Sequence, residues 1–481
     1  MSIDIKEKVE LRPSSNDLWF FAYLPLAISD GIATPLIPLL ALQHFGASAF
    51  AVTLIIAASA MSQVPFTILW GNLSDRIAHR KYFLVGSFAA TGVSIVLIAL
   101  AQDLVTFFWL NVVEGLAVAA SAPIGTMLLL ETRQKRWWPT DIGLFGLISG
   151  LGTTVGLALG ILWLFVVSRG QPPVPAMTAL LLLSGALALL AAGIAWWWIE
   201  EPKTRIARSA VAELIHLNRG AIERLRHVRS RVLNIIELTR APESRLPRRE
   251  WIFLAAMGVM SVGFDLFYGP FPVFLWQTSH LSDASVFVVY LGAAAASTAL
   301  FFHSGRAVEI YSPKSVFLGS LAARILLILV FVAAPTSVIF AFAGPDRTGA
   351  MTALNALMGV SWAFISTAST LFLIRLVGRA ARGRALGLYN AVAGMGSLIG
   401  TVLGGWLFVA AGFRFTYILA AAVVGVGLLL LLPIPYPVFR VRPRLARRPP
   451  PDPPERAAVR PLPMGTAGPG GAALSPPRRH R

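Results

Sequence analysis

The chain has 481 residues, of which 56% are hydrophobic and only 13% are charged. Soluble domains average about 25% charged residues, so this composition excludes an ordinary soluble protein and indicates a membrane protein. The sequence contains no cysteine, which excludes disulfides and thiolate catalysis, and its net charge of +18 falls in segments between apolar runs and in the tail, a pattern of membrane topology and not of nucleic-acid binding.

Twelve apolar runs are long enough to span a bilayer, which needs about 20 residues. The mixed-charge N-terminus lacks the pattern of a cleaved signal peptide, so the first run is expected to be a retained span. The runs lie at 17–42, 48–70, 82–101, 104–130, 142–167 and 176–199, and then at 251–276, 284–302, 315–334, 350–374, 385–411 and 415–435. We predict an all-α membrane protein with 12 transmembrane helices, with residues 335–349 as a non-cytoplasmic loop.

Two six-helix bundles, residues 1–199 and 250–438, are predicted on either side of a basic cytoplasmic linker, residues 200–249. Apolar residues recur in the linker at helical spacing between arginines, which indicates either an amphipathic helix on the inner leaflet or a plain helical connection. We favour the connection and allow that it also touches lipid. The tail, residues 439–481, is rich in Pro and Arg and is predicted to be disordered.

The distribution of Lys and Arg predicts the orientation, because cytoplasmic loops carry the excess of these residues. When the long linker and the tail are left out, the segments on the N-terminal side of the membrane hold 15 Lys and Arg, against three on the other side. Both termini are therefore expected in the cytoplasm.

The two halves resemble each other. A shift of 244 places four glycines of the fifth span on four of the eleventh: Gly150, Gly152, Gly156 and Gly160 on Gly394, Gly396, Gly400 and Gly404. Glycines at this spacing let helices approach closely, so we expect these positions to serve helix packing. Duplicated halves in like orientation describe a transporter built as two bundles around a central site.

Two stretches, SDGIATPLIPLL at 29–40 and FDLFYGPFPVFL at 264–275, each place an acid before two prolines in an apolar run. A charge at the bilayer centre costs about 2.5–3.5 kcal/mol on insertion scales, so Asp30 and Asp265 are expected to face a water-filled cavity or a partner. They could carry a proton or attract a cation, or each could be neutral and hydrogen-bonded. We favour function for these two and leave both interpretations open for Glu114. The prolines are expected to kink their helices and to serve either as gating points or as static packing devices.

The loop GNLSDRIAHRKYFLVG at 71–86 has a glycine that allows a tight turn, then an Asp-Arg pair and a basic pair: Gly71, Asp75, Arg76, Arg80 and Lys81. This spacing resembles the signature loop of the major facilitator superfamily, with Ala78 where the family usually has glycine. A less complete version of the same loop in the second half contains Gly305, Glu309 and Lys314. The resemblance covers about residues 15–437. It implies that these loop residues act as a conformational latch without touching the solute.

The same resemblance implies that the first, fourth, seventh and tenth spans line a central cavity. Asp30, Glu114 and Asp265 fall on three of these spans, and the further candidates for solute or ion binding are Thr34, Asn111, Tyr268, Asn355 and Trp362. Leu157 and Asn111 stand where drug–proton antiporters of the family have a proline and an arginine, which argues against that activity. Arg324 falls in the ninth span, which is peripheral in this fold, so an ion pair or snorkelling is favoured there over solute contact.

We therefore predict a secondary transporter of a small solute that works by alternating access. No nucleotide-binding loop is present in the sequence, which leaves an ion gradient, with protons favoured, as the driving force. The acids and nearby aromatic residues lean toward a cationic or amphipathic solute, hence efflux. A non-transporting sensor on the same fold, a lipid flippase and a membrane enzyme are the alternatives, and no convergent loop cluster supports an enzyme. The expected partners are the solute, protons and membrane lipid, without nucleic acid, metal or cofactor, for a monomer in the plasma membrane.

Overall fold

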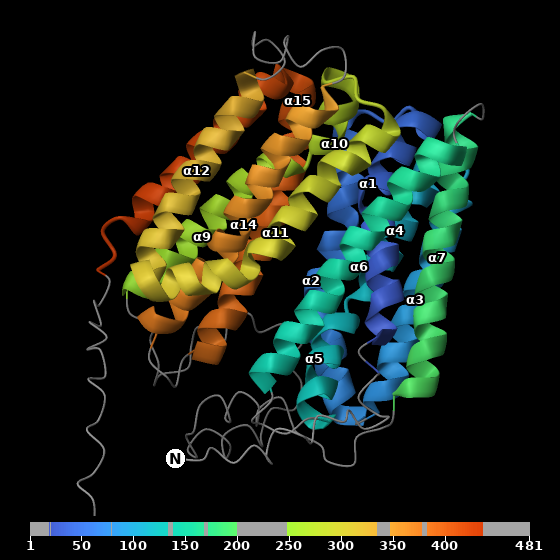
Figure 1. Ribbon diagram of the computed structural model, residues 1–481, viewed down its shortest axis with the longest axis horizontal. Coiled ribbons are helices and arrows are strands. Elements are labelled where there is room, and N and C mark those ends of the chain that lie inside the picture. The colour runs from blue at the N-terminus through green and yellow to red at the C-terminus, as the bar shows by residue number, and fades with distance from the viewer. Residues whose placement is uncertain are drawn as a thin grey trace, which may run out of the picture. The chain divides into compact units, whose positions relative to one another are not determined.

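The computed structural model describes residues 19, 21–77, 79–132, 138–167, 172–199, 248–333, 347–377 and 382–435. The regular elements of these residues are helices (Figure 1). Those of the first half are α1 (Tyr23–Phe45), α2 (Ala49–Ile77), α3 (Arg80–Ala99), α4 (Leu104–Val118), α5 (Ser121–Thr132), α6 (Trp138–Val167) and α7 (Pro173–Trp198). Those of the second half are α9 (Arg248–Tyr268), α10 (Phe271–Val273), the π-helical turn η6 (Phe274–Thr278), α11 (Asp283–Tyr311), α12 (Pro313–Ala333), α14 (Thr348–Leu376) and α15 (Arg382–Leu431).

Eleven stretches in the described part of the chain are long and apolar enough to cross a membrane, and the last of them contains two crossings. This stretch, Ala385–Leu431, has 47 residues and would be about 70 Å long as one helix, more than twice the thickness of a bilayer core. Gly412 breaks it with a φ of 80°. Both arms pack on the same part of α9, because Gly400 lies against Val262 while Val424 lies against Gly263. The helix therefore folds back on itself, and the predicted twelve-helix membrane architecture is confirmed.

Glycines bring two pairs of helices into close contact, one pair in each half. On α6, a Cβ built at Gly156 would overlap the carbonyl of Ile28 on α1. On α15, a Cβ at Gly400 would overlap the carbonyl of Val262 on α9. Such small residues allow backbones to approach where no hydrophobic driving force acts between helices. The same kind of contact is made by Gly152 with α1 and by Gly396 and Gly404 with α9, whereas Gly160 meets Phe287 of α11 in the other half.

The fourth span differs from its prediction as one helix, because α4 ends at Val118 and α5 begins at Ser121. Side chains of three other helices donate to the backbone carbonyls around this break: Trp70 Nε1 to Leu116 at 3.0 Å, Ser87 Oγ to Ala117 at 2.7 Å and the Tyr23 hydroxyl to Ser121 at 2.7 Å. Irregular backbone at membrane depth requires such partners, since lipid supplies none. Propensity and hydropathy within the span carry no information on donors from elsewhere in the fold.

The two proline-containing stretches behave differently from each other. The helix α1 continues through Pro35 and Pro38, whereas the seventh span breaks after Tyr268 and resumes at Phe271. The break at Gly269–Pro270 is followed by the π-helical turn η6, where the Ser279 N–H donates to the Phe274 carbonyl at 3.0 Å. Phenylalanines and tyrosines pack around it, with Phe267 5.2 Å from Phe271 and 4.5 Å from Tyr417 between ring centroids. The two copies of the acid–proline stretch are therefore not duplicates in backbone structure.

The signature loop also differs from its prediction in part. The helix α2 runs through Gly71 to Ile77, so this glycine does not make the predicted turn at the helix end. Arg80 is buried, and its Nη1 donates to Ser74 Oγ at 3.2 Å. The Lys81 ammonium lies 5.2 Å from the ring centroid of Trp196. The side chains of Asp75, Arg76 and Glu309 lie outside the described residues, as do residues 200–247, 334–346 and 436–481. These ranges hold most of the predicted linker 200–249, most of the predicted loop 335–349 and all of the predicted tail 439–481.

Candidate functional site

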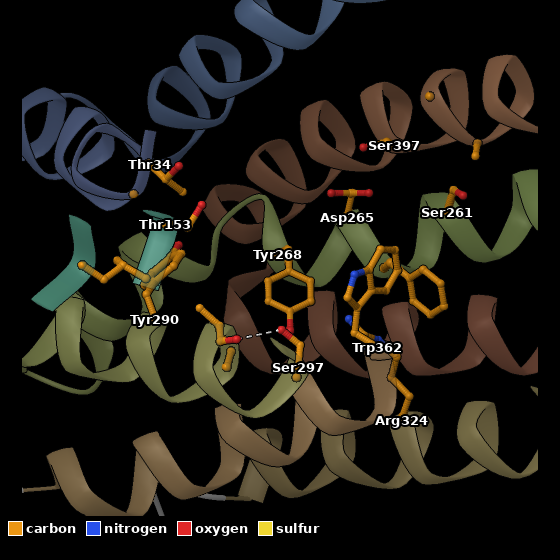
Figure 2. Close-up of a pocket in the computed structure, with 18 residues that line it drawn as sticks. Thr34, Thr153, Ser261, Asp265, Tyr268, Tyr290, Ser297, Arg324, Trp362 and Ser397 are labelled. Carbon is orange, nitrogen blue, oxygen red and sulfur yellow. Dashed lines mark hydrogen bonds between the residues drawn. The ribbon is translucent and has the colours of Figure 1, made fainter. Parts of the chain in front are cut away.

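A cavity of about 480 Å³ lies between helices of both halves. The first half contributes α1 and α6, and the second half contributes α9, α11, α12, α14 and α15. Its wall combines small residues and aromatic rings with hydroxyl groups and two ionisable side chains of opposite sign, Asp265 and Arg324 (Figure 2). The polar and aromatic members are Thr34, Thr153, Ser261, Phe264, Asp265, Tyr268, Tyr290, Ser297, Arg324, Trp362 and Ser397. A mostly apolar pocket with a few polar groups is the usual form of a small-molecule site.

Asp265 lies near the middle of the seventh crossing and is half-buried. Its carboxylate is directed toward the part of α15 that carries Ser397, and Ser261 lies one turn before it on α9 (Figure 2). Gly400 of α15 lets the two helices approach here, because a Cβ at Gly400 would lie 3.0 Å from the Asp265 Cβ. The carboxylate is thus held between two packed helices while it remains open to the cavity.

The structure contradicts two parts of the prediction for Arg324, its peripheral position and its snorkelling, whereas the ion pair predicted as the other possibility has a candidate partner in Asp265, whose charge is near enough to interact with it. Arg324 lies near the centre of α12 with only 2% of its surface exposed, and it lines the cavity. Its Nη1 donates to the Met358 carbonyl at 3.2 Å and to Ser361 Oγ at 3.0 Å, both on α14. Snorkelling needs a position near a helix end, where a long side chain reaches the interface. The position of Arg324, twelfth in a helix of 21 residues, excludes that behaviour.

Three aromatic rings surround the guanidinium group. The Arg324 Cζ lies 4.7 Å from the ring centroid of Phe264, 5.3 Å from that of Tyr268 and 5.6 Å from that of Trp362. Figure 2 shows the Arg324 side chain extending toward Trp362, with Tyr268 to one side. Cation–π contacts of this kind contribute about 0.5–2 kcal/mol each, the larger values applying in desolvated sites.

When the two halves are aligned by their helix contacts, the position of Asp265 in the second half corresponds to that of Gly31 in the first half. It does not correspond to the position of Asp30. Gly156 lies against Ile28 and Gly31, and its counterpart Gly400 lies against Val262 and Asp265. Successive residues on a helix point about 100° apart, so the two acids face different directions from the glycine-rich helices beside them. Gly31 accordingly lines the cavity, and Asp30 is not among its lining residues. The two acids are therefore not the equivalent pair that their sequence context predicts.

Asp30 and Glu114 instead belong to the first half. The Asp30 side chain is exposed and that of Glu114 is half-buried. Ser59 Oγ donates to Glu114 Oε2 at 2.8 Å, and the two carboxyl groups are close enough for their charges to interact. Neither Glu114 nor any other residue of α4 lines the cavity described above.

The remaining predicted binding residues divide into two sets. Thr34, Tyr268 and Trp362 line the cavity, and Thr34 Oγ1 donates to the Asp30 carbonyl at 2.9 Å. Asn111 and Asn355 are buried away from it. The amide of Asn111 donates to the Phe107 carbonyl at 2.8 Å, and the amide of Asn355 donates to the Val289 carbonyl at 2.9 Å. These two asparagines connect backbone segments, and a direct contact with a solute in this cavity is not available to them.

Sequence reasoning missed Arg324, Tyr290, Ser297 and Ser397. For Arg324 a signal was present, because an ionisable residue in mid-span is by default a candidate functional residue, whatever its sign. The hydroxyl residues gave no such signal, since Ser and Thr are common in transmembrane helices.

The comparisons with known proteins agree with this architecture. The family model described as Major Facilitator Superfamily matches residues 19–344 and, in an overlapping match, residues 253–477. The chain belongs to the major facilitator superfamily. Among curated protein sequences, none matches it.

Solved structures of superfamily transporters share its fold at low sequence identity. A mutant form of the nucleoside transporter NupG has a TM-score of 0.68 and 13% identity, over 88% of this chain and 100% of that one. The xylose transporter XylE from E. coli, in an inward open conformation, has a TM-score of 0.64 and 12% identity, over 89% and 98% of the two chains. A bacterial homologue of the human lysosomal transporter Spinster, in an inward-facing and unoccupied conformation, has a TM-score of 0.61 and 13% identity, over 87% and 94%.

Membership in the major facilitator superfamily makes the chain a multi-pass membrane protein and a secondary transporter of a small solute. Proteins of this superfamily are generally not enzymes, in agreement with the prediction from the sequence.

Proposed function

We propose that this superfamily member is a proton-coupled transporter of a small amphipathic solute, which binds in the cavity of about 480 Å³ next to Asp265. One observation carries the proposal: a carboxylate near the middle of a membrane crossing lines a cavity built by both halves of the protein. In alternating access the halves rock about such a midplane site and expose it to one side of the membrane at a time. A proton bound on one side is then released on the other.

Asp265 is the group in the cavity best suited to carry the proton. The charged or titratable lining residues are Asp265, Arg324, Tyr268 and Tyr290. Asp265 is the carboxyl group among them, and a carboxyl group binds and releases protons within reach of physiological pH when its surroundings disfavour the charge. Asp30 and Glu114 are a second pair of candidate proton carriers, in the first half.

The lining supports an amphipathic solute. Aromatic rings of Phe264, Tyr268 and Trp362 offer apolar contact area, and the hydroxyl groups around them offer hydrogen bonds. The structural neighbours include transporters of nucleosides and of xylose, and their identities of 12–13% support the fold without pointing to a solute.

The topology belongs to the same proposal. We place both termini in the cytoplasm and the protein in the plasma membrane, because the short loops on the N-terminal side carry the excess of Lys and Arg. The signature loop with Asp75 and Arg76 is proposed to act as the latch between conformations, as the family resemblance implies.

Proteoliposome flux tests the proposal. With an imposed pH gradient, we expect accumulation of an amphipathic solute by the wild type, and loss of gradient-driven accumulation with retained solute exchange in Asp265→Asn. A solute-exchange signal survives because the variant still binds and carries the solute. Asp30→Asn tests the second candidate in the same assay. Asp103→Asn is the matched control, since Asp103 is an exposed residue that caps α4 outside the cavity, and asparagine preserves such a cap.

The assay also separates the alternatives. A sensor would bind solutes without moving any of them, and a flippase would move fluorescent phospholipid between leaflets with no solute flux. Equal accumulation with and without a pH gradient would reject proton coupling while leaving the transporter intact.

A further inference from the structure

Arg324 places a positive charge inside the cavity, whereas the membrane acids and aromatic residues of the sequence predicted a cationic solute. Only 2% of the surface of this residue is exposed, and its side chain reaches the cavity from α12. A buried guanidinium is strongly disfavoured unless it is paired and hydrogen-bonded. How this charge is compensated therefore decides which solutes the cavity accepts.

The compensation found around Arg324 is incomplete. Its Nη1 donates to the Met358 carbonyl and to Ser361 Oγ, both of them neutral acceptors. Its Nε is buried and has no hydrogen-bond partner. Asp265 is near enough for its charge to interact with the guanidinium, and the Tyr268 hydroxyl is a further neutral hydrogen-bond partner, but the two hydrogen bonds of Nη1 go to α14. A buried guanidinium with only neutral hydrogen-bond partners is costly, so an anionic acceptor that a solute brings to its cavity-facing side would be bound strongly.

The aromatic rings do not form an empty cage for a foreign cation. Phe264, Tyr268 and Trp362 all lie within 5.6 Å of the Arg324 guanidinium, measured from Cζ to each ring centroid. Cages of this kind recognise cationic ligands when they are vacant. Because the protein's own cation occupies this one, an ammonium group entering the cavity would meet a like charge at the rings.

The charges of the cavity lead to a consistent solute class. The described lining holds one carboxylate and one guanidinium, which cancel when Asp265 is ionised. If Asp265 takes up a proton, the cavity carries one uncompensated positive charge at Arg324. A monoanion restores neutrality, and a carboxylate offers two oxygens to the planar guanidinium fork, the pairing for which arginine is best suited.

We propose that the cavity binds solutes that carry a carboxylate or a similar planar anionic group on an apolar or aromatic body, with Arg324 as the anion receptor. The inference rests on the proposed transport function. It replaces the cationic solute that the sequence led us to expect. The apolar body packs on Trp362 and Phe264, and the proton on Asp265 accompanies the anion so that the occupied cavity stays neutral. Arg324 and Asp265 thus have separate roles, in solute recognition and in coupling.

Three probes that share one skeleton test the charge preference: 3-phenylpropanoate, 3-phenylpropanamide and 3-phenylpropylammonium. Thermal unfolding of the purified full-length protein is measured with each probe at millimolar concentration. We expect the wild type to be stabilised most by the propanoate and least by the ammonium compound. Arg324→Gln is expected to weaken propanoate binding roughly tenfold or more, as for loss of a charged hydrogen-bond partner.

Further variants keep the test decisive if Arg324→Gln does not fold. Arg324→Lys retains the charge but not the fork, and an intermediate affinity is expected. Asp265→Asn removes the charge that competes for Arg324, so propanoate binding should strengthen severalfold. Arg414→Gln is the matched control, because Arg414 is an exposed residue outside the cavity. This variant should bind propanoate with the same affinity as the wild type.

Three results would overturn the anion receptor: the ammonium probe stabilises the wild type more than the propanoate does, Arg324→Gln binds propanoate as the wild type does, or none of the three probes stabilises the wild type.

Flux of the same probes into proteoliposomes distinguishes failure of the anion receptor from failure of the proposed transport function. Proton-driven movement of the ammonium probe would reject the anion receptor and keep the transporter, whereas solute binding without any flux would reject the transporter and keep the receptor.

Discussion

At the scale of single residues, the position of one glycine decides which acid reaches the cavity. Gly31 and Asp265 occupy matching places against the glycine-rich helices α6 and α15. A difference of one residue turns a helical side chain by about 100°, which is enough to move it to another face. The first half therefore presents a bare backbone where the second half presents a carboxylate.

Substitution of Gly156 tests whether these glycines hold the helices together. We expect Gly156→Ala to lower the free energy of unfolding by about 1–3 kcal/mol, because the added methyl group would overlap the Ile28 carbonyl and force α1 and α6 apart. Reversible unfolding in mixed micelles measures the change. Gly146→Ala on the same helix is the control, since nothing lies within 4 Å of its Cβ position, and alanine there should be neutral or stabilising by up to about 1 kcal/mol. Equal effects of the two substitutions would show that close approach at Gly156 is not important for stability.

At the scale of helices, the break between α4 and α5 is stabilised by groups that lie far away in the sequence. Tyr23, Trp70 and Ser87, from α1, α2 and α3, each donate to a carbonyl near the break. The buried Tyr23 ring also packs edge-on against Phe88 and Phe145, with ring centroids 5.0 and 4.6 Å away. This hydroxyl therefore ties the start of α1 to the middle of the fourth span.

Tyr23→Phe tests the contribution of this bond. It keeps the ring packing and removes one hydrogen bond from the Ser121 carbonyl, which also accepts within the helix because Ser121 is the first residue of α5. We therefore expect a loss of about 0.5–1.5 kcal/mol in the free energy of unfolding, the usual net contribution of a hydrogen bond. Denaturation in mixed micelles, monitored by circular dichroism, gives the value. Tyr82→Phe serves as the control because the Tyr82 side chain is 56% exposed. A Tyr23→Phe protein as stable as this control would mean that solvent or another donor satisfies the carbonyl.

Much of the molecule could be predicted from the sequence because its signals are local. The spans follow from hydropathy, and the family follows from the spans, the repeat and the signature loop. Asp265, Tyr268 and Trp362 follow from mid-span position and from the cavity that the fold implies. What could not be predicted depends on contacts between distant segments: the donors at the α4–α5 break, the helix register that separates Asp30 from Asp265, and the α14 acceptors that keep Arg324 buried.

At the scale of the whole transporter, the two halves are joined near the ends of the helices that we place outside the cell. The Gln43 amide at the end of α1 donates to the Asp283 carboxylate at the start of α11. Thr53, near the start of α2, fits against Gly405 of α15, and Gly160 of α6 fits against Phe287 of α11. In the proposed topology these contacts would close the solute path from outside, and two of the structural neighbours were solved in inward-facing or inward open conformations.

The Gln43–Asp283 bond is expected to bias the balance between the two conformations. A hydrogen bond to a charged group contributes about 1.5–3 kcal/mol, so Gln43→Ala should move the population toward the outward-facing state by roughly tenfold or more. The sequence contains no cysteine, which allows Ser297→Cys in the cavity wall to report on access without further changes. Labelling of this cysteine by a membrane-impermeant thiol reagent added outside intact cells should be slow in the otherwise native protein and faster with Gln43→Ala. Gln102→Ala, at an exposed glutamine before α4, should leave the rate unchanged. If Gln43→Ala leaves it unchanged as well, the bond does not hold the outer side closed, and the packing at Gly405 and Gly160 must do so alone.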